Sequence, residues 1–204
     1  MIHTTHAVFA VALTEVMLAS EHAPITWQAA ATAAVAYAVA PVPDIDQPES
    51  WISRHIPGAS VVSMFVRHRT LTHSLLVSAL LYLVLFGLGL RIPDWLATGI
   101  WVGWVSHWVI DLVNPRGVQL FYPLPWWVKP PVPWLAIEVE STGETVIRVA
   151  LTAFAVLFAL AYLFLHAPLE IQHAAGEVLP DARRVVGWGT WPWFGAVCRF
   201  LHLQ

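Results

Sequence analysis

The chain has 204 residues, of which 58% are hydrophobic and only 11% charged, with a mean hydropathy of +0.65. Soluble domains carry roughly 25% charged residues, so this composition argues against an ordinary soluble domain and predicts an integral membrane protein. The net charge of −3 argues against binding of nucleic acid. The single cysteine, Cys198, excludes an internal disulfide, a Cys-rich zinc site and an iron–sulfur cluster.

Five apolar helices are predicted in chain order, and the N-terminal segment lacks the basic residues of a cleaved signal peptide. We expect the helices over residues 7–20, 27–42, 72–90, 93–112 and 145–166. A span needs about 20 apolar residues, so the first two either lie in a locally thinned bilayer or form a buried or re-entrant hairpin. The expected fold is an all-α, polytopic bundle of about five transmembrane spans.

The tail of the chain permits two interpretations. Its stretch VVGWGTWPWFGAVCRFLHL is long enough for a sixth span. Pro192, three tryptophans and Arg199 favour a helix that lies in the membrane interface instead. We therefore divide the chain into a membrane-embedded domain, residues 1–166, and an interfacial or sixth-helix tail, residues 167–204.

Ionisable residues gather at the ends of the first four predicted helices. Consecutive helices of a serial bundle alternate in direction, and short connections make neighbours antiparallel. The start of the first helix, the end of the second, the start of the third and the end of the fourth therefore lie at one membrane face. The residues expected to meet there as metal ligands are His6, Asp44, Asp46, His68, His73, His107 and Asp111.

The spacing within this cluster fits metal binding. His107 and Asp111 are four residues apart, so they project from one helix face, and Asp44 and Asp46 would point the same way from an extended segment. Thr70 or Thr72 is expected to cap the third helix. Imidazole and carboxylate groups suit Zn²⁺, and also Mn²⁺ or Fe²⁺. Each element also has a plainer interpretation, as an interfacial hydrogen-bonded pair or a solvated turn.

The motifs at these positions resemble a known family. They are TH at 5–6, PDID at 43–46, HRTLTHS at 68–74 and HWVIDLVNPRGVQLFYP at 107–123, and together they are similar to the YdjM family of inner-membrane, metal-dependent hydrolases. The resemblance covers about residues 5–125 and implies that the seven residues form the family's metal site. Glu144 departs from the family pattern, because it directly follows Gly143.

The expected function is metal-dependent hydrolysis of a phosphoester or a lipid headgroup, with one or two ions that activate water. Seven ligands exceed the three or four that one zinc ion needs, which favours two ions. Otherwise one residue is left as general acid or base, and Asp46 and His73 are the candidates. Arg67, Arg69 and Arg116 are expected to bind the phosphate oxygens of the substrate.

Two other functions remain open at this point: an ion or proton transporter, and a metal-stapled membrane protein without turnover. The expected partner is membrane lipid. Positive charges favour the cytoplasmic side of the inner membrane for the site, because the opposite side has only Arg91 in a short loop. The site-side charges are Arg54, Arg67, Arg69, Arg116, Lys129 and Arg148.

Overall fold

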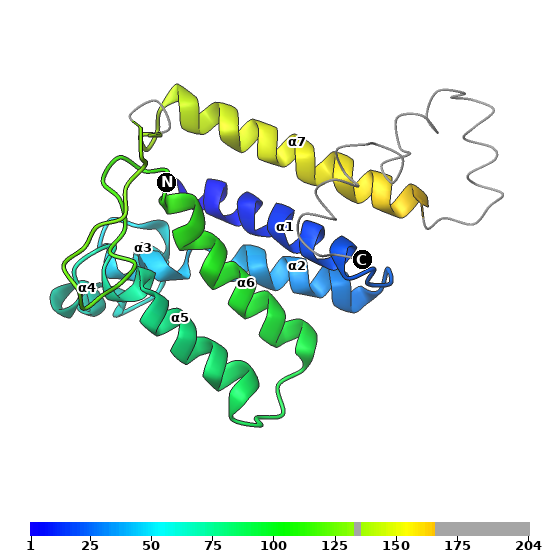
Figure 1. Cartoon of the computed structure of the whole chain (residues 1–204), viewed down its shortest axis with the longest axis horizontal. Helices are drawn as coiled ribbons and strands as arrows, with labels where there is room; N and C mark the ends of the chain where they lie inside the picture. The colour runs from blue at the N-terminus through cyan, green and yellow to red at the C-terminus, as the bar shows by residue number, and fades with distance from the viewer. Residues whose placement is uncertain (133–135, 166–204) are drawn as a thin grey trace.

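The computed structural model describes residues 1–132 and 136–165, and these residues form helices and connecting segments (Figure 1). The predicted tail, residues 167–204, lies outside the described residues. The long helices are α1 His3–Ser20, α2 Trp27–Val39, α6 Asp94–Asp111 and α7 Thr142–Leu165. The shorter ones are η1 Val42–Asp46, α3 Trp51–His55, η2 Ala59–Val61, α4 Val62–Phe65, η3 Leu71–His73, α5 Leu75–Tyr82 and η4 Leu83–Gly87.

All five predicted helices are present, so the all-α prediction is confirmed for the described residues. The number of membrane spans is not. Among the described residues, only α7 is both long and apolar enough to cross a membrane, and α5 with η4 forms a shorter apolar stretch, Leu75–Gly87. The described helices therefore do not confirm a bundle of five transmembrane spans.

The connection between α2 and α5 is more ordered than the sequence suggested, and it corrects two predictions. Asp44 and Asp46 lie in the 3₁₀ helix η1 and not in an extended segment. Neither threonine caps α5: the cap is Ser74, whose hydroxyl accepts from the backbone N–H of Val77 at 3.2 Å. The 3₁₀ helix η3 ends at His73 and delays the start of α5, which frees Thr72 for contacts inside the cluster.

Small residues let α2 and α6 pack closely. A Cβ atom on Gly99 would lie 2.8 Å from the carbonyl oxygen of Thr32, and one on Gly103 would lie 2.7 Å from that of Ala36. Two glycines four residues apart permit such an approach of helix backbones. This close packing brings the last turn of α6, which carries His107, beside the C-terminal end of α2 at Ala40.

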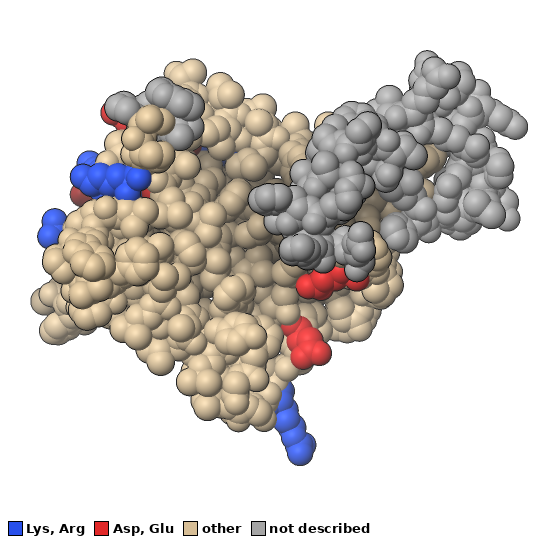
Figure 2. Space-filling model, in the orientation of Figure 1, with Lys and Arg blue, Asp and Glu red and all other residues tan. Residues whose placement is uncertain are grey.

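The helix ends that were expected to meet do lie together. In Figure 1 the start of α1, the end of α6, the start of α7 and the short helices α3 and α4 occupy one end of the molecule. Figure 2 shows that, on its visible face, charged side chains lie at the ends of the molecule and leave the middle uncharged. An uncharged band between charged ends is the surface expected of a membrane protein.

Candidate metal centre

All seven predicted ligand residues come together in the structure. They form three overlapping groups whose ligand atoms lie within 4.8 Å of one another. His107 belongs to two of these groups and Asp44 to two, so the three groups make one continuous cluster. Their members are His6, His107 and Asp111; Asp44, His73 and His107; and Asp44, Asp46 and His68.

Three atoms in the middle of the cluster are spaced like ligands of one ion, and an oxygen of Asp111 lies close to one of them. His107 Nε2 lies 3.0 Å from His73 Nε2 and 3.3 Å from Asp44 Oδ1. His73 Nε2 lies 3.7 Å from Asp44 Oδ1 and 3.8 Å from Asp111 Oδ2. Tetrahedral zinc with bonds of about 2.0 Å places its ligand atoms roughly 3.3 Å apart. Asp44, His73 and His107 therefore offer three ligand atoms to a tetrahedral divalent ion, and Asp111 is the nearest candidate for the fourth.

The hydrogen bonds behind the two rings direct both Nε2 atoms to this point. His107 Nδ1 lies 2.6 Å from the carbonyl oxygen of Ala40, which can only accept, so Nδ1 carries the proton. Thr72 Oγ1 donates to Asp46 Oδ2 at 2.5 Å and therefore accepts from His73 Nδ1 at 2.8 Å. Two neutral rings would thus point lone pairs at each other, and a cation between them removes the repulsion.

The local electrostatics agree with a positive charge at this point. Burial lowers the pKa of His73, and the neighbouring charge on His107 lowers it further, to about 3. The ring of His73 is therefore neutral at pH 7. Burial alone would raise the pKa of Asp44, but the charge of His107 and a hydrogen bond from it hold that pKa well below its usual value. A proton on His107 or a metal ion can supply this charge.

His6 completes the inner side of the cluster. Its ring stacks on His107, with the ring centroids 3.8 Å apart, and its Nε2 lies 3.6 Å from Asp111 Oδ1. Both ring nitrogens are buried without a hydrogen-bond partner. A buried imidazole normally has such a partner, so the bare nitrogens are a second sign that this place suits a cation.

His68 differs from the other histidines because part of it is accessible. Its side chain is 25% exposed, whereas those of His6, His73 and His107 are fully buried. Its Nδ1 lies 2.7 Å from Asp46 Oδ1 and 3.9 Å from Asp44 Oδ1. The shorter contact is a hydrogen bond, which puts the proton on Nδ1 and leaves Nε2 free.

The cluster borders a cavity of about 1050 Å³. Asp44 and His68 line this cavity, whereas Asp46 and His73, the predicted acid/base candidates, do not. The wall also includes seven charged or aromatic residues outside the cluster: Glu49, Trp51, Arg54, Arg69, Arg116, Glu138 and Glu140. A molecule in the cavity would therefore meet Asp44 and His68 before any other member of the cluster.

The three arginines predicted to bind substrate have three different environments. Arg69 is buried: its guanidinium lies 3.1 Å from Asp111 Oδ2 and donates to Asn114 Oδ1 at 2.6 Å. Arg67 does not line the cavity, because its guanidinium lies over the ring of Trp127, 5.5 Å from the centroid. Of the three, only Arg116 is exposed at the cavity. Arg54, which the sequence analysis did not select, is exposed there as well.

Arg69 also occupies an unusual backbone conformation. Its φ is +65°, in the left-handed region that residues other than glycine rarely adopt. The backbone N–H of Arg69 donates to Asp46 Oδ2 at 3.3 Å, and its carbonyl accepts from Gln119 at 2.9 Å. These contacts stabilise the turn that separates His68 from His73, and the two rings meet edge to face with centroids 5.5 Å apart.

The sequence analysis missed the role of Glu144. This carboxylate is fully buried at the start of α7, where Oε1 accepts from the backbone N–H of Ile2 at 2.5 Å and Oε2 from that of Glu140 at 2.7 Å. It is therefore a structural link between the first residues, which lie beside Asp111, and α7. The only signal in the sequence was an acidic residue in the first turn of an apolar helix.

Replacing Glu144 with alanine is expected to lower the thermal midpoint of the protein in detergent by at least about 5 °C. Hydrogen bonds to a charged group contribute about 1.5–3 kcal/mol each, and 1 kcal/mol shifts the midpoint of a chain of this size by about 2–4 °C. Differential scanning fluorimetry measures the change. Glu138→Ala, at an exposed carboxylate of the same segment, is the control. An equal effect of both variants would contradict the structural role.

Over the described residues, the fold and the site together define a helical protein with one helix long and apolar enough to cross a membrane and a buried His/Asp cluster that could hold a metal ion. Comparison with protein families places it further. Residues 1–170 match the family described as YdjM inner membrane protein, so the chain belongs to this family and is an inner-membrane protein.

Curated relatives agree with this assignment. The chain is 33% identical over 113 residues to Uncharacterized protein YvsG of Bacillus subtilis, which covers 54% of this chain and 67% of that protein. It is 31% identical over 98 residues to Inner membrane protein YdjM of Escherichia coli, covering 45% of this chain and 48% of that protein. The chain thus aligns with about half the length of the E. coli relative. No solved structure matches.

Proposed function

We propose that this protein is a membrane-embedded, metal-dependent hydrolase of phosphoesters, with a lipid headgroup as its favoured substrate. The observation that carries the proposal is the position of the cluster: buried ligand atoms on one side, and Asp44 and His68 open to a cavity of about 1050 Å³ on the other. A purely structural metal site has no need of such a cavity, because structural sites are closed.

The residues that would hold the ion are Asp44, His73, His107 and Asp111. A divalent ion bound there would lower the pKa of a water molecule towards about 7 and polarise the phosphoester. The nitrogen and oxygen donors suit Zn²⁺, and also Mn²⁺ or Fe²⁺. One ion is favoured over two, because the hydrogen bond to Asp46 Oδ1 keeps a proton on His68 Nδ1 and so prevents that atom from binding a metal.

His68 is the residue best placed to move a proton. Its Nε2 is free and its ring borders the cavity, while Asp46 fixes the ring through Nδ1. A carboxylate behind a histidine orients it and stabilises its charged form. This assignment replaces His73 with His68 as the acid/base group and gives Asp46 a positioning role.

Arg54 and Arg116 would bind the phosphate of the substrate. Both are exposed at the cavity, and neither forms an ion pair with another described residue. Arginine donates paired hydrogen bonds to phosphate oxygens. Arg69 instead holds Asp111 and Asn114 in place, and Arg67 contacts Trp127.

The test is a turnover assay on the purified full-length chain after its metal content has been measured. The protein is loaded with Zn²⁺, Mn²⁺ or Fe²⁺ and incubated with headgroup-labelled phospholipids in mixed micelles, and with a soluble phosphodiester. We expect release of the headgroup to be faster than cleavage of the soluble ester, and to be absent in Asp44→Asn. Tightly bound metal without cleavage of any phosphoester would favour a structural metal site and contradict the proposal.

His68→Gln is expected to lower turnover by about 100-fold, the usual scale of general acid–base catalysis, while metal content stays near that of the native chain. Asp46→Asn is expected to lower turnover less, because it disturbs only the orientation of the ring. His55→Gln is the control, since His55 is exposed and its Nδ1 contacts the carbonyl of Trp51. Loss of metal in His68→Gln would instead make His68 a ligand.

The site is proposed to face the cytoplasm, because positive charges cluster at its end of the molecule. Cysteine at Glu49, on the cavity wall, is expected to resist a membrane-impermeant maleimide in intact cells and to react after permeabilisation. Both labelling experiments use a Cys198→Ser background. Labelling of Glu49→Cys in intact cells would reverse the orientation.

A further inference from the structure

Two short segments beside the metal centre expose apolar side chains to an unusual degree. In the first, α4 has no buried residue, and Met64 and Phe65 are 77% and 82% exposed. These are higher values than for any large hydrophobic side chain of α7, the helix suited to lipid. We name the following set the apolar lip: Val61, Met64, Phe65, Phe121, Leu124 and Trp126, all at least 45% exposed.

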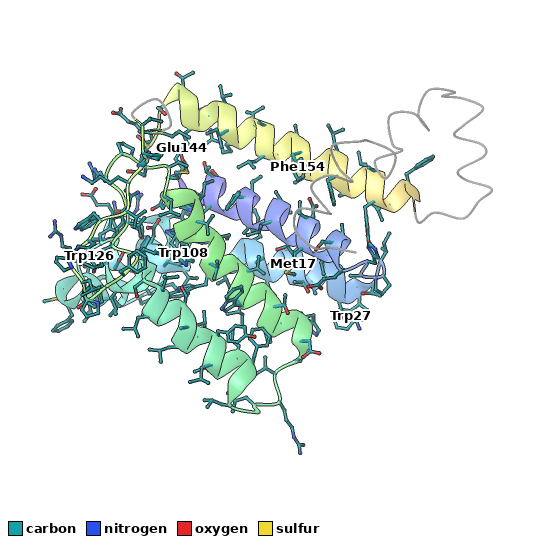
Figure 3. The ribbon with its side chains drawn as sticks, viewed as in Figure 1. Met17, Trp27, Trp108, Trp126, Glu144 and Phe154 are labelled. Atoms are coloured by element: carbon teal, nitrogen blue, oxygen red, sulfur yellow. The ribbon has the colours of Figure 1, made fainter. Side chains whose placement is uncertain are left out.

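Residues 59–67 form the first segment of the lip and residues 119–131 the second, and contacts between side chains and backbone hold them in place. Arg67, which follows α4, lies over Trp127 of the second segment at 5.5 Å. The second segment is closed by paired backbone hydrogen bonds between Val118 and Val128, and the carbonyl of Leu120 accepts from the N–H of Leu75 at 2.9 Å. Figure 3 places Trp126 at the end of the molecule where α4 lies.

The lip continues an apolar surface that runs along α5. Leu75, Leu76 and Leu80 on this helix, and Leu83 at the start of η4, are each 40–52% exposed. The lip therefore lies at the end of an apolar helix face, on the same end of the molecule as the start of α7 (Figure 1). With α7 across the bilayer, this end of the molecule would lie where hydrocarbon changes to headgroups.

The charges of the lip are all positive. Arg67 and Lys129 are exposed within or beside it, and residues 59–67 and 119–131 contain no aspartate or glutamate. Exposed apolar side chains with tryptophan and flanking cations are typical of segments that lie in the interface of an anionic bilayer. An acidic protein surface would form ion pairs with these cations, but it would leave the apolar side chains exposed to water.

We propose that the apolar lip inserts into the headgroup region of an anionic phospholipid leaflet, with Arg67 and Lys129 on lipid phosphates. Because His68 directly follows Arg67, this insertion would hold the open side of the metal centre at the level of the headgroups. The inference stands without the hydrolase proposal. The experiment below measures insertion and no turnover, so the two fail separately.

The test uses the full-length chain with Cys198→Ser, in nanodiscs of phosphatidylcholine alone or mixed with phosphatidylglycerol. An environment-sensitive fluorophore is attached to Phe65→Cys, or to Glu49→Cys as the exposed control outside the lip. We expect the label at 65 to shift to the blue, to be quenched by a nitroxide near the lipid headgroup and to be protected from iodide. The label at 49, on the wall of the cavity, should show no blue shift and should stay accessible to iodide.

The charge component is tested with Lys129→Gln, which leaves the contact between Arg67 and Trp127 intact, and with Arg67→Gln added. Both should reduce nitroxide quenching at 65 in anionic discs but not in neutral ones. Equal iodide quenching at 65 and 49 would overturn insertion. Protection that appears only as more chains are placed in each disc would assign the lip to a second copy, and equal protection in both lipids would overturn the preference for anionic lipid.

Discussion

Replacing His107 with alanine is expected to abolish metal binding by the purified protein. His107 belongs to two of the three ligand groups, and its Nε2 lies within 3.3 Å of both His73 Nε2 and Asp44 Oδ1. Loss of a partner outside the ligand shell typically costs 10–100-fold in metal affinity, so loss of this ligand should exceed about 100-fold. Elemental analysis after size-exclusion chromatography measures the effect.

Asp111→Asn is the companion variant, because it keeps the shape of a second ligand and removes its charge. It also leaves the Arg69 guanidinium, 3.1 Å away, without its carboxylate. We expect it to lose metal as His107→Ala does. His55→Ala, outside the cluster, should keep the native metal content. Native content in all three variants would show that the cluster does not bind metal and that its histidines form a buried polar network only.

Chelation is expected to lower the thermal midpoint of the protein by about 8–16 °C. Ligand bound at a thousand times its dissociation constant stabilises a fold by about 4 kcal/mol, and 1 kcal/mol corresponds to about 2–4 °C for a chain of this size. The physical reason is that Asp44 lies in η1, His73 in η3, and His107 and Asp111 in α6, so that one ion would hold three elements together. The measurement is a melting curve in detergent before and after chelation, with the midpoint recovered on reloading.

The His107→Ala variant serves as the control for that experiment. If the chelator acts by removing an ion from the cluster, this variant should melt at the same temperature with and without it. A chelator effect of equal size in the variant would place the relevant ion elsewhere in the chain. No effect in the native chain would contradict the metal centre described above.

The sequence by itself determined the helical class and the membership of the cluster. Short connections make consecutive helices antiparallel, so the direction of each helix, and with it the face where His6, Asp46 and His107 lie, follows from the order of the apolar segments. All seven predicted ligand residues meet for this reason. Neither the exact helix limits nor the packing distances were needed for that result.

Only the tertiary structure decided what each polar residue does within the cluster. Arg69 and Arg116 look alike in the sequence, yet the first is buried against Asp111 and the second is exposed at the cavity. His68 and His73 are only five residues apart in the sequence. A left-handed turn at Arg69 places His68 at the cavity and His73 in the buried part of the cluster. Such roles depend on burial and on partners distant in the chain.

Glu144 shows the same limit most clearly. Its carboxylate binds the backbone N–H of Ile2, 142 residues away, and nothing in the local pattern of α7 indicates that partner. Local periodicity fixes which residues are apolar and which way a helix runs, because those properties depend on near neighbours. The pairing of buried polar groups is decided by the packing of whole helices, where every buried donor and acceptor needs a partner.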